Sequence, residues 1–143
     1  MKPILLNFEH VNQCFEFDKL ERLNHWSYKI WEKGLNEINS LNAGIFLKKE
    51  LISLASASVI LDELHLTYIS VKKNYRKKSY GLKTLMFLLN LSRSRDLKRV
   101  TLEVNEKNQA AIGLYKKIGF IHSGTRKRYY PSGDNAFILW FDL

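Results

Sequence analysis

A dense run of basic residues is the first feature of the sequence that could do chemistry. Residues 71–84 contain six lysine or arginine side chains and no acidic one, and they lie between a strand-like run and an apolar helical run. Cations and free backbone N–H groups at the start of a helix form a site for phosphate. Gly81 in the first helical turn favours a pyrophosphate, because a side chain there would block close approach. A solvated basic turn and a nucleic-acid patch, with Tyr75 and Tyr80 stacked on bases, remain alternatives.

Two further residues are candidates for proton transfer. Glu103 lies on the polar face of an alternating strand pattern, opposite Val100 and Leu102. The pattern allows either a partly enclosed carboxylate or a side chain in solvent. Tyr115 falls on the apolar stripe of a short helix, where it could be a core aromatic or a proton donor. Glu106 is close by in sequence, and we expect it to be exposed in a loop.

These residues need a scaffold of helices and strands to position them. Apolar residues three and four positions apart predict helices over residues 12–23, 27–38, 79–95 and 108–118, with Ser27 and Asn108 as N-caps and Gly119 as the stop of the last. Strands are predicted over residues 4–8, 45–47, 53–61, 64–71, 98–105, 120–129 and 136–141, with turns at 42–44, 62–63 and 131–134. This order predicts a single α/β domain over residues 1–143 with a mixed sheet.

Composition and charge bound the class of protein and its partners. The chain has 143 residues, 45% of them hydrophobic, which is enough for one domain with a core. Residues 1–63 hold seven basic and nine acidic residues, whereas residues 64–143 hold sixteen basic and five acidic, so the anionic partner is expected in the second half. Cys14 is the only cysteine, which suits a reducing cytosol. We find no signal peptide, membrane span or metal-ligand spacing, and expect a cytoplasmic protein without a metal.

The motifs around these residues resemble the signatures of the GNAT acetyltransferase superfamily. Residues 103–120, Glu-Val-Asn-Glu-Lys-Asn-Gln-Ala-Ala-Ile-Gly-Leu-Tyr-Lys-Lys-Ile-Gly-Phe, resemble the pattern Asn-x-x-Ala-x-x-Leu-Tyr-x-x-x-Gly-Phe. Residues 76–81, Arg-Lys-Lys-Ser-Tyr-Gly, resemble the acetyl-CoA signature Gln/Arg-x-x-Gly-x-Gly/Ala. The tail at 126–136 and the segments at 25–27 and 61–63 are similar to the RimI-type branch. Ser79 stands where the first glycine is usual, and Asn135 where an acidic residue often precedes the tail alanine.

The resemblance implies a GNAT fold, in which helices flank a mixed, largely antiparallel central sheet. It implies transfer of acetyl from acetyl-CoA to a protein N-terminal α-amine, in the RimI-type branch an alanine of a ribosomal protein, by direct transfer and without a metal. Glu103 would be the base and Tyr115 the acid. Two alternatives stay open: a GNAT enzyme that acetylates a lysine or a small amine, and a basic RNA-binding module without catalysis. A membrane or nucleic-acid partner is not expected from the resemblance.

The same resemblance assigns the residues that would bind acetyl-CoA. Backbone groups of the strand before the basic loop would pair with the pantetheine arm, and the loop would hold the pyrophosphate. The residues are Ile69, Ser70 and Val71 for the arm, Arg76, Lys77, Lys78, Ser79, Tyr80, Gly81 and Leu82 for the pyrophosphate, and Asn108 for a further contact. We expect the Ser79 amide to face phosphate and its hydroxyl to cap the helix. Residues 126–130 would line the acceptor groove.

Overall fold

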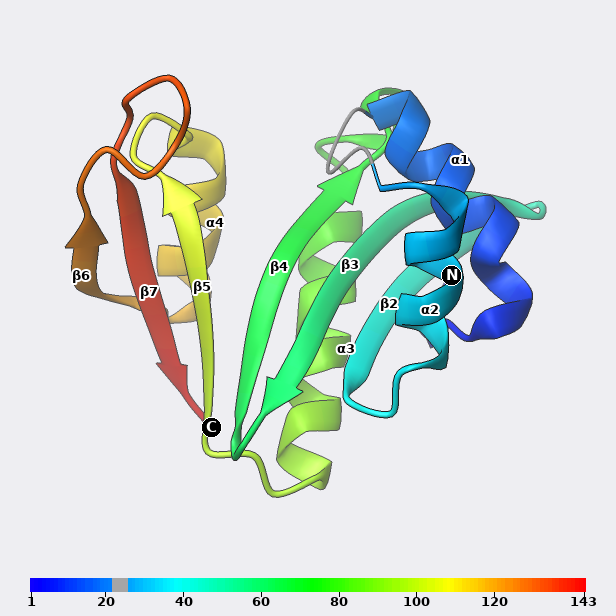
Figure 1. Ribbon diagram of the computed structural model, residues 1–143, viewed down its shortest axis with the longest axis horizontal. Coiled ribbons are helices and arrows are strands. Elements are labelled where there is room, and N and C mark those ends of the chain that lie inside the picture. The colour runs from blue at the N-terminus through cyan, green and yellow to red at the C-terminus, as the bar shows by residue number, and fades with distance from the viewer. Residues whose placement is uncertain (22–25) are drawn as a thin grey trace.

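A seven-stranded sheet forms the centre of the residues that the computed structural model describes, 1–21 and 26–143 (Figure 1). Its strand order is β1-β2-β3-β4-β5-β7-β6. The strands are β1 (Ile4–Leu5), β2 (Ser40–Leu47), β3 (Glu50–Ile60), β4 (Glu63–Val71), β5 (Arg99–Asn105), β6 (Ile121–Arg126) and β7 (Ala136–Asp142). The helices are α1 (Val11–Glu21), α2 (Tyr28–Asn36), α3 (Tyr80–Ser94) and α4 (Gln109–Ile118), with 3₁₀ turns η1 (Phe8–His10) and η2 (Lys73–Tyr75).

Strands β4 and β5 are the parallel neighbours in this sheet, and they pair over a short length. Their register runs from Glu63 opposite Arg99 to Leu66 opposite Leu102, and beyond it the strands diverge (Figure 1). A shift in the pairing of β4 with β3 leaves Thr67 as an extra residue at the point of divergence. Such a bulge bends its strand, and a gap therefore opens between the ends of β4 and β5. The other neighbouring strands are antiparallel, which confirms the mixed, largely antiparallel sheet.

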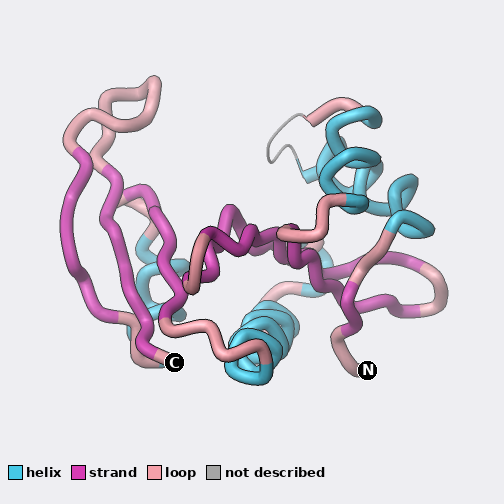
Figure 2. The backbone as a smooth tube through the Cα atoms, turned by 60° about the horizontal axis from the view of Figure 1, so that its bottom comes forward, coloured by secondary structure: helices cyan, strands magenta, loops and turns pink. Residues whose placement is uncertain are grey.

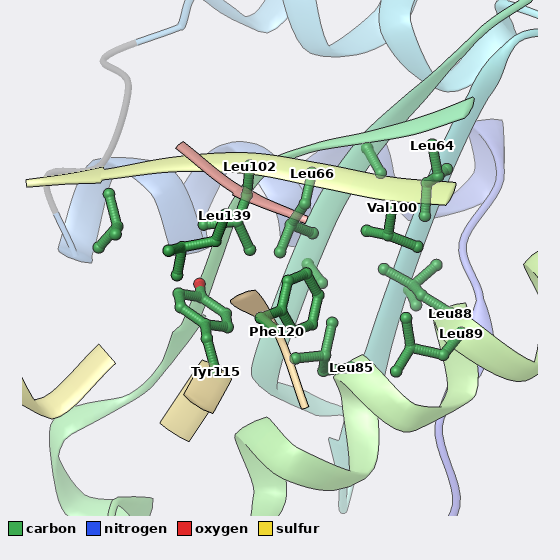
Figure 3. Packing of buried hydrophobic residues seen from close by; sticks show 14 of the residues in the cluster. Leu64, Leu66, Leu85, Leu88, Leu89, Val100, Leu102, Tyr115, Phe120 and Leu139 are labelled. Atoms are coloured by element: carbon green, nitrogen blue, oxygen red, sulfur yellow. The ribbon is translucent and has the colours of Figure 1, made fainter. Parts of the chain in front are cut away.

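Helices cover both faces of the sheet (Figure 2). On one face α3 and α4 close a core in which leucines of the sheet and of α3 meet the aromatic rings of Tyr115 and Phe120 (Figure 3). On the other face α1 and α2 cover a second cluster built around Phe17, Trp31 and Leu54. Each fully buried large apolar side chain contributes roughly 1.5–3 kcal/mol relative to an exposed one. The two clusters therefore fix the helices, and with them the ends of β4 and β5.

The turn predicted at residues 42–44 is wrong, because these residues lie inside β2. The buried Asn42 side chain accepts a hydrogen bond from Ser56. A Cβ added to Gly44 would lie 2.8 Å from the carbonyl oxygen of Ser53. Asn42 and Gly44 thus allow β2 and β3 to pack closely, although asparagine and glycine are typical of turns.

Other predicted boundaries change by a few residues. The strand predicted at 4–8 ends at Leu5, because Asn7 caps η1, and the strand predicted at 120–129 ends at Arg126. The turn predicted at 62–63 lies one residue earlier, because Glu63 already belongs to β4. The helix predicted at 12–23 corresponds to α1, which ends at Glu21, and its last two predicted residues lie outside the described residues. Ser27 caps α2 as predicted, with its hydroxyl accepting from Ile30 N–H at 3.2 Å.

Candidate active site

The end of β4 presents backbone N–H groups to the gap beside β5. The Lys72 N–H donates to the carbonyl of Ile52 at 2.9 Å. Because antiparallel pairing alternates along a strand, Ser70, opposite Leu54, also turns its backbone toward β3. Ile69 and Val71 therefore turn their N–H groups to the gap. Amides fixed in this way can stabilise negative charge as it develops on a carbonyl oxygen.

The basic loop ends at the N-terminus of α3, where several amides are unused. The first backbone bond of the helix runs from Lys83 N–H to the Ser79 carbonyl at 3.0 Å. The N–H groups of Tyr80, Gly81 and Leu82 precede it and are free for a ligand. Ser79 adopts the left-handed conformation, φ 66° and ψ 16°, and its hydroxyl makes no capping bond, so the predicted cap is wrong. The free amides and the positive end of the helix dipole favour an anion here.

Gly81 brings the start of α3 close to the end of β4. A Cβ added to Gly81 would lie 3.4 Å from Val71 Cγ2. The missing side chain therefore lets helix and strand lie close together. As a result, the free amides of α3 and those of β4 are neighbours, and one extended ligand can touch both sets.

Two of the six loop cations already have carboxylate partners. Lys72 Nζ lies 2.9 Å from Glu50 Oε2. Arg76 Nη2 lies 2.9 Å from Glu21 Oε1, and Arg76 Nε donates to the Val71 carbonyl at 2.9 Å. Within the described part of the chain, no carboxylate pairs with the remaining four, which are Lys73, Lys77, Lys78 and Lys83. The loop therefore keeps positive charge for an anionic ligand.

Glu103 lies on the face of β5 that turns away from α3 and α4, and it is partly enclosed. Its side chain is 32% exposed, and Arg126 Nε of β6 lies 3.3 Å from Glu103 Oε2. The charge of Glu103, followed by a hydrogen bond to it, raises the pKa of Tyr129. Burial, followed by the charge of Glu103, raises the pKa of Tyr130. Three residues of the predicted acceptor segment thus surround this carboxylate.

Helix α4 positions two of the predicted residues. Tyr115 is 5% exposed, and its ring centroid lies 5.5 Å from that of Phe120, with the hydroxyl directed toward the sheet (Figure 3). Burial raises the pKa of Tyr115 to about 12, so the phenol stays protonated at neutral pH. Asn108 caps the helix as predicted, because its Oδ1 accepts from Ala111 N–H at 3.2 Å. Tyr115 is therefore a buried core aromatic whose hydroxyl keeps its proton at neutral pH.

The loop after β5 is tied to the tail by residues that sequence reasoning left without a role. Glu106 Oε2 accepts from Asn135 N–H, and Glu106 N–H donates to the Asn135 carbonyl at 3.0 Å. Asn135 Oδ1 accepts from Arg128 N–H at 2.9 Å. The expectation that Glu106 is exposed is wrong, because it is half-buried and its carboxylate holds the tail. Of the two glutamates, Glu106 holds the tail, whereas Glu103 contacts the predicted acceptor segment.

The structure offers neither a reactive thiol nor a metal site among the residues that it describes. Cys14 is fully buried, and burial raises the pKa of its thiol to about 12, which leaves it protonated and inert. Over the described ranges, 1–21 and 26–143, no group of His, Cys, Asp and Glu side chains is placed to hold a metal ion. No described helix is long and apolar enough to cross a membrane.

A family comparison covers most of this site. The model of the acetyltransferase (GNAT) family matches residues 7–120, a span that contains the basic loop, Glu103 and Tyr115. The chain belongs to the acetyltransferase (GNAT) family. A ribosomal protein bS18-alanine N-acetyltransferase from Haemophilus ducreyi is 31% identical over 139 residues, which cover 92% of each chain.

Solved GNAT structures have the same fold. The crystal structure of the ribosomal-protein-S18-alanine N-acetyltransferase from Escherichia coli has a TM-score of 0.89 and 26% identity, over 99% of this chain and 92% of that one. Arabidopsis thaliana NAA60 in complex with acetyl-CoA has a TM-score of 0.88 at 13% identity, over 99% and 97% of the two chains. At that identity the second likeness concerns the fold alone.

This GNAT acetyltransferase gathers most of its sequence-predicted residues around one gap. The amides of Ile69 and Val71 and the start of α3 lie together, and the acceptor segment surrounds Glu103. Sequence reasoning missed Glu21, which lies 55 positions before its partner Arg76, and no local pattern links the two. It also missed the pairing of Arg126 with Glu103, although the basic tail was a signal that could have suggested it.

Proposed function

We propose that this GNAT acetyltransferase transfers the acetyl group of acetyl-CoA to the N-terminal α-amine of a protein, with an alanine of a ribosomal protein as the acceptor. The observation that carries the proposal is the gap between β4 and β5, which has anion-binding amides at one end and Glu103 beside it. Relatives whose names state this reaction, and which align with nearly the whole chain, support the choice of acceptor.

In this proposal the donor lies along the free amides. The amides of Tyr80, Gly81 and Leu82 hold the pyrophosphate, together with the unpaired lysines of the loop. Each helix-terminus contact contributes only about 0.3–1 kcal/mol, so several must act together. The N–H groups of Ile69 and Val71 bind the pantetheine arm, and one of them steadies the oxyanion. Asn108 adds a contact while it caps α4.

Glu103 takes the proton of the attacking amine, directly or through a water. An α-amine has a pKa of about 7.7–8.0 and a lysine amine one of about 10.4. At neutral pH the lysine costs about 3.5 kcal/mol more to deprotonate. A partly exposed carboxylate that is already paired with Arg126 suits the easier task. This argument favours an N-terminal amine over a lysine.

Tyr115 donates to the sulfur as the thioester carbon–sulfur bond breaks. A thiol has a pKa of about 8.5, well below the value of about 12 for Tyr115. Tyr115 is therefore a good hydrogen-bond donor, and its contribution is greatest while negative charge is building on the sulfur as the carbon–sulfur bond breaks. The proton that the thiolate finally gains is balanced by the one that the amine loses to Glu103.

The test is acetyl-CoA consumption with peptides that differ only at their first residue. A peptide with a blocked N-terminus and one internal lysine is the control. We expect turnover on free N-termini, fastest with alanine, and none on the control. Faster turnover on the lysine control would favour the lysine alternative. No turnover on any peptide, together with salt-sensitive RNA binding, would favour the RNA-binding alternative.

A further inference from the structure

A small polar pocket lies beneath α2, and none of its lining residues belongs to the candidate active site described above. It has a volume of about 100 Å³ and lies between α2 and strands β2, β3 and β4. Asn42, Ser56 and Ser58 form polar walls, and Trp31 and Gly34 of α2 lie on the opposite side. The residues that line it carry no ionisable side chain. A pocket with this lining suits a neutral ligand, because an unpaired charge is costly to bury.

Asn42 gives the pocket unused hydrogen-bond donors. Asn42 is 5% exposed and Ser56 is 6% exposed. Ser56 Oγ donates to Asn42 Oδ1 at 2.7 Å, whereas no described residue accepts a bond from Asn42 Nδ2. The NH₂ group of Asn42 is not fully enclosed and reaches the space of the pocket, where water can accept from it. An occupant that displaces this water keeps the hydrogen bond only if it supplies an acceptor of its own.

The pocket opens next to the candidate base. Thr67 lines the pocket and is the extra residue at which β4 leaves β5. The last paired residues of the two strands are Leu66 and Leu102, so Thr67 and Glu103 are the next residue on each strand. Thr67 and Glu103 therefore stand on the two sides of the gap, at the point where the strands begin to diverge (Figure 1). Glu103 and the pocket also share the sheet face that turns away from α3.

Gly34 lines the pocket on the side of α2. It lies inside α2, where glycine costs about 1 kcal/mol relative to alanine. A Cβ added to Gly34 would meet nothing within 4 Å. The glycine is therefore not required by packing, and a larger side chain at this position has room to fill the pocket.

We propose that this pocket binds a short, neutral, hydrogen-bonding side chain, such as that of serine or asparagine, from the second or third residue of the acceptor. The proposal rests on the proposed function, in which the first residue offers its amine to Glu103. Each further residue adds at most about 3.6 Å of reach, so the second and third residues are the first whose side chains can extend from Glu103 to the pocket. A volume of about 100 Å³ fits a short side chain.

The experiment compares alanine-initiated peptides that carry serine, asparagine, valine or aspartate at the second or the third position. With the wild-type enzyme we expect kcat/KM to be about tenfold higher for serine or asparagine than for valine or aspartate at one of these positions, because valine and aspartate leave the Asn42 donors unpaired or bury a charge. Gly34→Leu should remove this preference by raising KM for the serine and asparagine peptides.

Gly113→Leu is the matched control, because Gly113 is also a helical glycine whose added Cβ would meet nothing within 4 Å. It should keep the preference. Equal kcat/KM for all peptides with the wild-type enzyme would overturn the pocket and leave the proposed function intact. If no peptide is acetylated, the proposed function fails. Binding to the pocket is then tested separately by titrating the peptides and following the fluorescence of Trp26 and Trp31, which line it. Peptide titrations that do not distinguish serine from valine would then overturn the pocket as well.

Discussion

At the scale of single residues, Glu103 and Glu106 form a natural pair for separating chemistry from structure. Glu103→Gln keeps the shape of the side chain and removes its ability to take a proton. We expect kcat to fall about 10²–10⁴-fold with unchanged thermal unfolding. Glu106→Gln should spare kcat and lower stability, because this carboxylate holds the Asn135 N–H. Wild-type turnover in Glu103→Gln would remove Glu103 from the role of base.

Tyr115 couples activity to stability at alkaline pH. Its pKa of about 12 in the folded protein lies above the ordinary value of about 10, so the unfolded chain loses this proton first. Because the folded protein keeps the Tyr115 proton and the unfolded chain releases it, the free energy of unfolding is at its full value below pH 10 and falls as pH rises from 10 to 12. Tyr115→Phe should therefore lose less stability than wild type across this window, by on the order of 2 kcal/mol.

Urea unfolding at pH 9, 10 and 11 measures the rise of this difference, which reaches roughly half of its full size at pH 11, and turnover at pH 8 measures the proposed donor role. We expect Tyr115→Phe to lower kcat about 10²-fold or more with little change in acetyl-CoA binding. An unchanged kcat would leave Tyr115 with a packing role alone. If the free energy of unfolding falls with pH equally in wild type and Tyr115→Phe, the Tyr115 hydroxyl is not desolvated in the folded protein.

At the scale of elements, an ion pair joins the end of α1 to the loop before α3. Arg76 contacts Glu21, whose side chain is only 9% exposed, and the Val71 carbonyl. Glu21→Gln should loosen the loop and weaken acetyl-CoA binding several-fold in calorimetry. Glu50→Gln breaks the pair between Lys72 and the Glu50 side chain, which is 45% exposed, and should change little, because pairs with an exposed carboxylate contribute about 0–1 kcal/mol. Tighter binding in Glu21→Gln would instead mean that Arg76 binds phosphate once released.

The elements also show how far the sequence could be interpreted without the structure. Helix α4 is predictable from end to end, because its cap at Asn108 and its stop at Gly119 are local signals. The pairing of Arg126 with Glu103 depends on the register of β5, β6 and β7, which no local pattern specifies. The left-handed Ser79 is likewise a property of the assembled loop. Motif spacing thus predicted which residues form the candidate site, and long-range packing set the geometry in which the structure places them.

At the scale of the whole molecule, the uneven charge distribution poses the choice between a nucleotide-like ligand and RNA. The second half of the chain carries sixteen basic residues against five acidic ones, yet the free amides of α3 and β4 form a compact site. A compact site binds through fixed dipoles as well as through charge. RNA held by a basic surface relies mainly on the release of counterions, which is strongly salt-dependent.

Salt therefore separates the two partners. If four unpaired lysines gripped single-stranded RNA, affinity would fall by roughly 600-fold per tenfold rise in salt, at a slope of about −0.7 per contact. We expect the dissociation constant for acetyl-CoA to rise less than tenfold between 50 and 500 mM salt, because the amides of α3 are close to the ligand and poorly screened. Calorimetry across this range measures it. A loss of several hundredfold for acetyl-CoA would mean that surface charge, rather than the helix terminus, holds the phosphates.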